Sequence, residues 1–532
     1  LVAIPKNASF VLAFNAKQIV EKAGLNKPEQ YKFYSVIQDE INKLPADQSK
    51  SVKDFLKDTR NSGLNLDNVF LYLVVNDNIS EDRIRPLCFG ITFLVDDLKT
   101  FENSLKKNES IPWDGDEKII SMGISGYSLQ WNDKIAVISY NDNAEDNNIN
   151  LFNTDAANSI LANELFKADY SAKNDVYLFA EWNTIINLLQ DFSNDYYSTN
   201  QLSNASLAQY KDMSIAISLN DEKGSYVATA KLLPEEKASE MYEKYSKTDF
   251  DNNLYKYFPA NSLMAIKFAL KPLSAYNEYK KAIGIGQAEE PVESTTEQVE
   301  TLDEKGNVIE TEDVVIDKYN GYASNYNHEI KMLVEQYDEK ITSVLSCFTG
   351  DFLGSISDIA NMQQPDFAIA AGIAEGKESD VTALMKEIGF TANTDGYYTL
   401  NAGYYKVYFA INQNIAYVTM STDAVAKFLD KGYSPDITSA ENLGKEIKEA
   451  LSYFYLNINI NDYPAMLKTL LNMSMGGQAQ IMMPFLEKLQ SVNIKQNKNG
   501  GEFRIKFNEN EYASKIILKA VDAVASSSLD LD

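Results

Sequence analysis

The sequence predicts an α+β fold built from two tandem copies of one unit, each with mainly antiparallel sheets and helices packed on one face. Strand-like and helix-like segments mix along the chain without strict β-α-β alternation, which favours this class. Several segments of the first half also return in the second half in the same order. A chain of 532 residues is too long for one hydrophobic core. We therefore assign the first copy to residues 1–250 and the second to residues 251–532.

The recurrence begins near the first residue of the chain. The segment Ile4–Phe14 reads IPKNASFVLAF, and the segment Phe258–Phe268 reads FPANSLMAIKF. Aligning them pairs four identical residues, which are Pro5 with Pro259, Asn7 with Asn261, Phe14 with Phe268 and Lys17 with Lys271. One short window is weak evidence, so the prediction of a duplication depends on further matches.

Two later segments supply those matches. Residues Leu129–Ser139, LQWNDKIAVIS, match Phe409–Thr419, FAINQNIAYVT, and the segment around Ile217 matches the segment around Ile494. The offset between matched residues increases once and then nearly holds. This pattern predicts a duplication with one insertion in the second copy.

Composition identifies the insertion as Gly286–Val315. This segment is rich in Glu and Thr and has few large apolar residues. Its centre can form a solvated hairpin that turns at Lys305–Asn307, because Gly and Asn tolerate a positive φ. The segment is either a recognition arm or, as its composition favours, a mobile acidic loop.

The first elements have visible start and stop signals. An apolar run over Ser9–Phe14 is typical of a buried strand, and Asn15 can cap a helix with Gln18 three residues later. Gly24 is expected to end that helix. At the matching place in the second copy the asparagine is absent, so Pro272 is expected to begin the helix.

Antiparallel signals follow between these units. Residues 126–140 predict two strands around a two-residue turn at Asn132–Asp133. Residues 66–77 and 85–95 predict two more strands, followed by a helix that Asp96 or Asp97 starts. Pro365 opens a comparable strand and helix in the second copy.

The charge of the chain restricts its partners. The sequence holds 76 Asp and Glu against 49 Lys and Arg, for a net charge of -27. A surface this negative repels phosphate backbones and anionic membrane surfaces, so we expect no nucleic-acid partner. The general use of such a charge is solubility. No apolar run approaches the roughly 20 residues that a membrane-spanning helix needs.

The sequence contains no catalytic, cofactor or metal motif, and we predict no residue for any such site. The one histidine, His328, lacks the second histidine of a zinc-protease helix, and no nucleophile elbow accompanies any serine. The glycines at Gly284–Gly286 lack the third glycine of a dinucleotide fingerprint. Asn141–Asn148 offers oxygen ligands but not the pattern of a calcium loop, so a polar loop is the favoured interpretation.

Cysteines, tryptophans and methionines all favour packing roles. Cys88 and Cys347 have no ligand-like spacing, and a disulfide between them stays open. Trp113, Trp131 and Trp182 all lie in the first half and suit sugar stacking, but the last two lie in or beside strands, where packing is usual. The segment Met466–Leu486 can form an adaptable apolar groove, but we expect a core helix broken at Gly476–Gly477 and Pro484.

The opening segment Ala3–Leu25, AIPKNASFVLAFNAKQIVEKAGL, resembles an uncharacterised family of large, acidic, internally duplicated lipoproteins from Bacteroidetes. The family is a domain of unknown function, and the resemblance covers the whole chain. It implies a signal peptide and a lipid-bearing cysteine just before Leu1, and hence an outer-membrane lipoprotein that faces the periplasm or the cell surface. Removal of such a segment would explain a first residue other than methionine.

Two functional hypotheses follow from these observations. The leading one is an exported, lipid-anchored envelope protein that binds an envelope protein or a glycan without catalysis, and that contacts the membrane only through its anchor. The alternative is a hydrolase that acts on glycans with a pair of carboxylates, which need to lie roughly 5 to 10 Å apart in a cleft. Sequence spacing does not report that distance.

Overall fold

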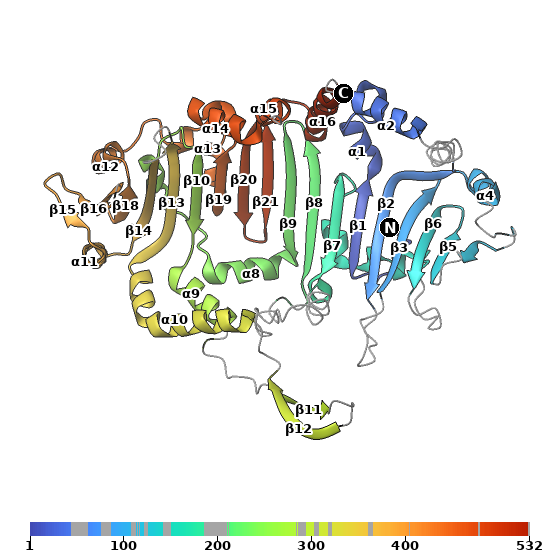
Figure 1. Ribbon diagram of the computed structural model, residues 1–532, viewed down its shortest axis with the longest axis horizontal. Coiled ribbons are helices and arrows are strands. Elements are labelled where there is room, and N and C mark those ends of the chain that lie inside the picture. The colour runs from blue at the N-terminus through green and yellow to red at the C-terminus, as the bar shows by residue number, and fades with distance from the viewer. Residues whose placement is uncertain are drawn as a thin grey trace.

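One continuous antiparallel sheet dominates the molecule. The computed structural model of the chain describes residues 1–43, 62–75, 87–107, 113, 115, 117–121, 126–141, 151–185, 210, 212–283, 285, 294–302, 308–317, 322–359, 365–403, 405–476 and 479–529. Within these residues a 19-stranded sheet runs the length of the molecule, and a separate two-stranded hairpin projects from it (Figure 1). Helices mix with the strands, so the α+β prediction is confirmed.

The elements have the following bounds. The strands of the large sheet are β1 (Phe10–Asn15), β2 (Leu64–Val75), β3 (Leu87–Val95), β4 (Ile119–Ser121), β5 (Tyr127–Trp131), β6 (Ile135–Asn141), β7 (Val176–Glu181), β8 (Ser214–Glu222), β9 (Ser225–Leu233), β10 (Met264–Ala269), β13 (Phe348–Asp358), β14 (Asp366–Ile373), β15 (Thr391–Ala392), β16 (Tyr398–Ala402), β17 (Tyr405–Asn412), β18 (Ile415–Thr419), β19 (Ser452–Asn457), β20 (Leu489–Asn497) and β21 (Gly500–Phe507). The α-helices are α1 (Ala16–Lys22), α2 (Lys32–Lys43), α4 (Leu98–Lys107), α5 (Glu164–Asp169), α8 (Glu235–Tyr245), α9 (Pro272–Ala282), α10 (Tyr322–Leu345), α11 (Glu378–Ile388), α12 (Thr422–Leu429), α13 (Gly444–Glu449), α14 (Ala465–Met475), α15 (Ala479–Leu486) and α16 (Ala513–Leu529). Short 3-10 helices are η1 (Pro28–Gln30), η2 (Ala156–Asn158), η3 (Ile160–Ala162), η4 (Asn252–Tyr257), η5 (Ile437–Ser439) and η6 (Ile460–Asp462).

The strand order places β9 and β21 next to each other near the middle of the sheet. On one side of this pair the strands follow as β9-β8-β7-β1-β2-β3-β6-β5-β4. On the other side they follow as β21-β20-β19-β10-β13-β14-β18-β17-β16-β15. The β9–β21 pair is antiparallel and joins the two halves of the chain, so the sheet continues across the boundary near residue 250.

Each half also contributes a helix to the other half. Helix α16, the last helix of the chain, contacts α2, β8 and β9 of the first half, and α8 contacts α9 of the second half. Polar contacts between the two halves reinforce this helix packing. The Asp221 carboxylate accepts the backbone N–H of Ser514 at 3.3 Å, and Lys498 forms an ion pair with Glu243 of α8 at 2.6 Å. The two halves therefore interlock.

One face of the sheet carries the two main clusters of the hydrophobic core. Side chains alternate between the two faces of a strand, and the buried set points to the face covered by η3 and α5 in the first half and by α12, η5 and α13 in the second. The large residues buried on this face are Tyr72, Tyr177 and Phe179 in the first half and Tyr417, Tyr453 and Tyr455 in the second. Two helices pack on the other face, because Phe101 and Leu105 of α4 contact Ala136, and Val381 of α11 packs in one cluster with Ala416. The expectation that helices pack on one face only is therefore wrong.

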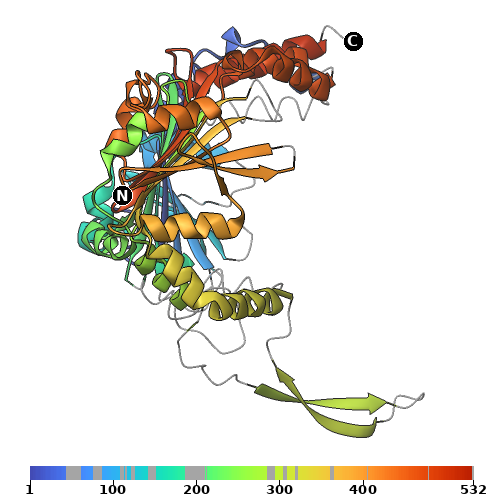
Figure 2. The ribbon, with the colours of Figure 1, turned by 90° about the vertical axis from the view of Figure 1, so that its left-hand side faces the viewer.

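The opposite face is apolar as well, but it is only partly covered. Leu12 lies in register with Leu178, which in turn lies in register with Ile217, and all three are half-buried. Near the middle of the sheet Ile494 lies opposite Phe503, and these side chains are 45% and 41% exposed. Figure 2 shows α10 at one end of the strands and the helices near the C-terminus at the other.

Several local predictions are confirmed. The backbone N–H of Gln18 donates to the Asn15 side chain at 3.1 Å, and Gly24 follows helix α1 with a φ of 73°. Pro272 is the first residue of α9. Asp97 accepts the backbone N–H of Thr100 at 3.0 Å, as the cap of α4 should.

Two local predictions are wrong. Trp131 pairs with Ala136, and the backbone N–H of Asn132 donates to Ile135, so the tight turn is at Asp133–Lys134 rather than one residue earlier. The methionine-rich segment is not a core helix either. In α14 no residue is buried, and Met466 and Met473 are 63% and 74% exposed, because this helix runs along the ends of the strands. Pro484 lies inside α15 and does not end it.

The predicted insertion, Gly286–Val315, contains all but the last two residues of the separate hairpin. Strands β11 (Ser294–Leu302) and β12 (Val308–Asp317) pair with each other and project away from the large sheet (Figures 1 and 2). The predicted turn at Lys305–Asn307 lies outside the described residues.

Candidate functional site

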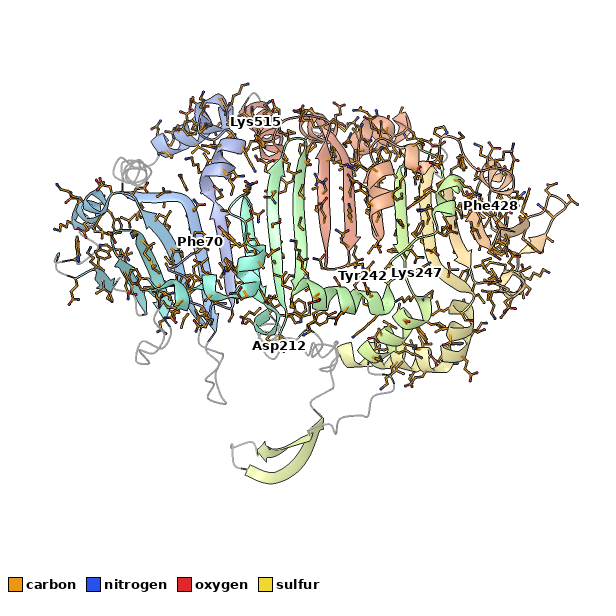
Figure 3. The ribbon with its side chains drawn as sticks, turned by 180° about the vertical axis from the view of Figure 1, so that it is seen from behind. Phe70, Asp212, Tyr242, Lys247, Phe428 and Lys515 are labelled. Carbon is orange, nitrogen blue, oxygen red and sulfur yellow. The ribbon has the colours of Figure 1, made fainter. Side chains whose placement is uncertain are left out.

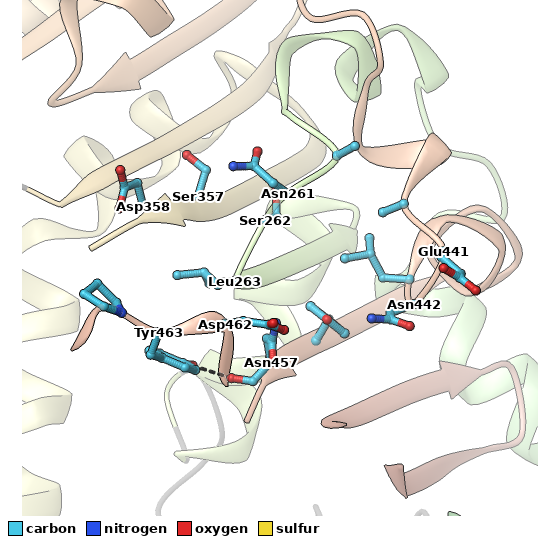
Figure 4. Close-up of a pocket in the computed structure, with 15 residues that line it drawn as sticks. Asn261, Ser262, Leu263, Ser357, Asp358, Glu441, Asn442, Asn457, Asp462 and Tyr463 are labelled. Atoms are coloured by element: carbon cyan, nitrogen blue, oxygen red, sulfur yellow. Dashed lines mark hydrogen bonds between the residues drawn. The ribbon is translucent and has the colours of Figure 1, made fainter. Parts of the chain in front are cut away.

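A pocket of about 680 Å³ lies in the second half, where β10, β13 and β19 meet the segments around η5 and η6 (Figure 4). We call it the polar pocket. Its polar lining residues are Asn261, Ser262, Ser357, Asp358, Glu441, Asn442, Tyr455, Asn457, Asp462 and Tyr463. They come from four separate stretches of the chain, which the sheet brings together.

Backbone hydrogen bonds fix the floor of the polar pocket. The N–H of Leu263 donates to Ile356 at 2.7 Å, and the N–H of Asn457 donates to Leu263 at 2.7 Å. The hydroxyl of Ser262 donates to the carbonyl of Pro259 at 2.8 Å. Pro259 and Ser262 therefore close a turn that contains Asn261. Asn261 belongs to the repeated segment Phe258–Phe268 and lies just before strand β10.

Side chains hold one another in place on the next wall. The Asn457 amide donates to the Asp462 carboxylate at 2.8 Å, and its oxygen accepts the backbone N–H of Asn459 at 2.8 Å. The hydroxyl of Tyr463 donates to the Asn457 carbonyl, as the dashed line in Figure 4 shows. These bonds orient the amide and the carboxylate without any ligand, so this wall is preorganised.

Charges in the polar pocket are all negative. Among the described lining residues the only charged side chains are Asp358, Glu441 and Asp462, with no lysine, arginine or histidine. Burial raises the pKa of Tyr455 to about 12 and also raises the pKa of Tyr463, so both hydroxyls stay protonated at neutral pH. The pocket thus offers hydrogen-bond donors and acceptors but no cation for a phosphate or a carboxylate.

A fourth carboxylate, that of Asp366, lies beside the polar pocket. Asp366 of β14 is the direct cross-strand partner of Asp358. Burial raises the pKa of Asp366, and the nearby carboxylates Asp358 and Asp423 raise it further. Two acids with one raised pKa are the arrangement that general acid catalysis by carboxyl groups requires.

The described residues contain no group of three or more His, Cys, Asp or Glu side chains placed to hold a metal ion. The predicted calcium-loop candidate Asn141–Asn148 lies outside the described residues after its first position, and so do the side chain of His328 and the glycines Gly284 and Gly286. Cys88 and Cys347 are buried and form no disulfide.

Two tryptophans considered for sugar stacking pack inside the first half. Trp131 is buried, with the rings of Phe101 and Trp113 edge-on at 5.8 and 5.2 Å. Trp182 directly follows β7, and its ring lies 5.2 Å from the ring of Tyr210. For Trp131 the predicted packing role is confirmed.

The residues of the polar pocket were not predicted from the sequence. A signal did exist for part of the pocket, because Asn457 ends the apolar strand β19, and Asn459, Asn461 and Asp462 follow it in close succession. Asp358 and Glu441 gave no signal, since each is one acid among many.

The described helices include none that is long and apolar enough to cross a membrane.

Comparison with known families places the chain. A family model described as Domain of unknown function (DUF4836) matches residues 2–514. The chain belongs to this family. The predicted membership of an uncharacterised domain family is thereby confirmed. No curated protein and no solved structure matches the chain.

Proposed function

We propose that the protein is an exported, lipid-anchored envelope protein that binds a glycan in the polar pocket without chemical turnover. The observation that carries the proposal is the lining of this pocket. Amides, hydroxyls and carboxylates surround about 680 Å³ with no cation among the described lining residues. A sugar hydroxyl both donates and accepts hydrogen bonds, so a neutral molecule with many hydroxyls matches this wall.

A glycan array with a pair of matched variants tests this proposal. Asn261 and Asn7 are both exposed and occupy aligned positions in the two halves, but only Asn261 lines the polar pocket. The protein should retain a defined set of glycans, and Asn261→Ala combined with Glu441→Gln should lose them. Asn7→Ala should bind as the parent does. Equal retention by the pocket variant, or no bound glycan at all, contradicts the proposal.

A hydrolase that acts on glycans is the second candidate. The opposed carboxyls Asp358 and Asp366, together with the raised pKa of Asp366, favour it. In this alternative Asp366 is the general acid and Asp358 is the carboxylate that faces the sugar. Release of reducing ends from a bound glycan, lost in both Asp366→Asn and Asp358→Asn, would select this function. Recovery of intact glycan after prolonged incubation would reject it.

Export and lipid anchoring rest on the resemblance to lipoproteins. Growth of cells in a radioactive fatty acid should label the full-length protein, and replacement of the cysteine at the expected cleavage site should abolish the label. A protein that remains unlabelled in the cytoplasm contradicts this part of the proposal.

We also propose that residues 1–250 and 251–532 are copies of one unit. The strand order supports this, because reading outward from the β9–β21 pair gives the same succession of chain positions on both sides. Ile135 begins β6 and Ile415 begins β18, and these strands occupy the same place in the two successions. Superposing the halves should place Ile135 on Ile415 and Ile217 on Ile494. Any other placement contradicts the duplication.

A further inference from the structure

A second pocket, of about 300 Å³, lies where the two halves join. We call it the seam pocket. Helix α8 of the first half forms one wall with Met241, Tyr242 and Tyr245, and the β20–β21 hairpin of the second half forms the other. Figure 3 shows Tyr242 on α8, beside the ends of the central strands. Neither half alone contains this pocket.

Tyr242 has an unusual environment in this wall. Its side chain is only 3% exposed, and its hydroxyl has no hydrogen-bond partner in the part of the chain that the structure describes. Most buried hydroxyls are hydrogen-bonded, because leaving one unpaired after removing it from water is unfavourable. A ligand with an acceptor oxygen in the seam pocket would supply the missing partner.

The charged residues of the seam pocket differ in sign from those of the polar pocket. Its described lining residues include Lys495 and Lys498 and no acid, although the whole chain has a net charge of -27. Lys498 lies 2.6 Å from Glu243 of α8. Lys495 pairs with Glu449 of α13 at 3.4 Å on the other face of the sheet, so only Lys498 directs its charge toward this pocket. Lys498 remains 45% exposed, so its ammonium can also contact an anion at the mouth of the pocket.

Apolar surface continues from the seam pocket across the sheet. Ile494, a lining residue, is 45% exposed and lies opposite Phe503, which is 41% exposed. On its other side Ile494 lies opposite Phe454, which lies opposite Ile266. A hydrocarbon chain placed over this row would remove apolar side chains from water.

We propose that the seam pocket binds an anionic amphiphile, namely a single hydrocarbon chain that ends in a carboxylate. The carboxylate accepts a hydrogen bond from Tyr242 and lies near Lys498, and the chain extends over Ile494 and Phe503. This site is separate from the polar pocket and does not depend on the glycan proposal. Lys498 favours the carboxylate over a neutral sugar, and the apolar row favours the chain.

Calorimetry with oleate, kept below the concentration at which it forms micelles, tests this inference on the full chain. We expect one oleate per chain. Tyr242→Phe should weaken binding by about tenfold, since it removes one hydrogen bond to a charged group. Ile494→Glu should abolish binding, because it places a negative charge under the chain. Tyr279→Phe, on the exposed side of α9, is the control and should bind as the parent does.

Folding is checked separately, and the outcomes are distinct. Tyr242→Phe removes only an unpaired hydroxyl, so its thermal midpoint should equal or exceed that of the parent. No oleate binding by the parent, or unchanged affinity in both pocket variants, overturns the inference. Equal affinity for oleyl alcohol would contradict the proposed role of the carboxylate. Displacement of oleate by a neutral sugar would contradict the proposal that the ligand is an amphiphile. Loss of glycan binding in the polar-pocket variant, with oleate binding intact, leaves this inference standing.

Discussion

The two halves enter the sheet in the same way. In the first half the backbone N–H of Ile160 donates to the carbonyl of Ile4 at 2.9 Å, and in the second half the N–H of Ile437 donates to Phe258 at 2.8 Å. Ile4 and Phe258 open the two segments that the sequence repeats. This backbone contact of the repeated motif is therefore the same in both halves.

Side chains differ at places where the backbone agrees. The N–H of Glu181 donates to Ser9 at 2.9 Å, and the N–H of Asn457 donates to Leu263 at 2.7 Å in the corresponding position. Asn457 lines the polar pocket, whereas the first half has a glutamate there. The comparison shows that the same backbone contact carries different side chains in the two halves, and that in the second half this side chain lines a pocket.

The cores differ as well, and most clearly at Lys267. In the sequence alignment of β1 with β10, Ala13 occupies the position of this lysine. Lys267 is 1% exposed and donates to the Tyr255 hydroxyl and the Ile447 carbonyl at 2.8 Å and to the Ala450 carbonyl at 2.7 Å. Burial lowers the pKa of Lys267 to about 8. The lysine thus pairs the carbonyls at the end of α13 inside a core where the first half has a methyl group.

The largest expected effect comes from separating the halves. Residues 1–250 expressed alone would expose the β9 edge and lose the contacts of α16 with α2, so we expect an insoluble or aggregated product. Co-expression with residues 251–532 should restore a soluble complex in size-exclusion chromatography. A monomeric first half that unfolds cooperatively by itself would show that the interlocking contacts are dispensable.

The next effect concerns the core lysine. Lys267→Met leaves the Ile447 and Ala450 carbonyls without their donor, so we expect a loss of about 1–3 kcal/mol in the free energy of unfolding at pH 7. Lys445→Met, at a surface lysine whose side chain is 84% exposed, is the control and should change the stability by less than about 0.5 kcal/mol. Denaturant titration measures both variants. Equal stability of Lys267→Met and the parent would show that the amine does not support α13.

The pH dependence of the free energy of unfolding gives a second comparison between the parent and Lys267→Met. The pKa of Lys267 is about 8 in the folded chain and about 10.5 in the unfolded chain, so the unfolded state binds more protons between these values. The parent should therefore gain stability relative to Lys267→Met as the pH rises from 8 to 10. Below pH 8 the difference between them should stay constant. A difference that narrows with rising pH would contradict the assigned direction of the pKa shift.

The smallest effect is expected from the projecting hairpin, which has no counterpart among the described residues of the first half. Replacing residues 286–317 by a short Gly-Ser linker should leave the thermal midpoint within roughly 2–4 °C of the parent, since loop closure depends weakly on length. Differential scanning calorimetry measures the change. A loss above about 10 °C or an insoluble product would mean that the hairpin packs against the large sheet.

Much of the fold could be predicted because its signals are local. Alternating apolar residues, the cap at Asn15 and the proline that begins α9 each act within a few residues. The prediction that the methionine-rich helix α14 lies in the core was wrong because it, too, depended on a local signal. Its apolar composition is a local property, whereas its exposure follows from its position along the ends of the strands.

The polar pocket could not be predicted because its geometry is not local. Asn261, Asp358, Glu441 and Asp462 lie far apart in the sequence and meet only after β10, β13 and β19 pair. The seam pocket is a stronger case, since its two walls come from different halves. The β9–β21 pairing creates the seam pocket, and neither the order nor the composition of the repeated segments predicts this pairing.

The stoichiometry of glycan binding tests the central claim most directly. Titration of a glycan selected on the array, followed by calorimetry, should give one site per chain, because the residues that line the polar pocket all belong to the second half. The site should disappear in the Asn261→Ala and Glu441→Gln double variant and persist in Asn7→Ala. Two equal sites per chain, or loss of binding in Asn7→Ala, would contradict the claim that one half alone carries the binding function.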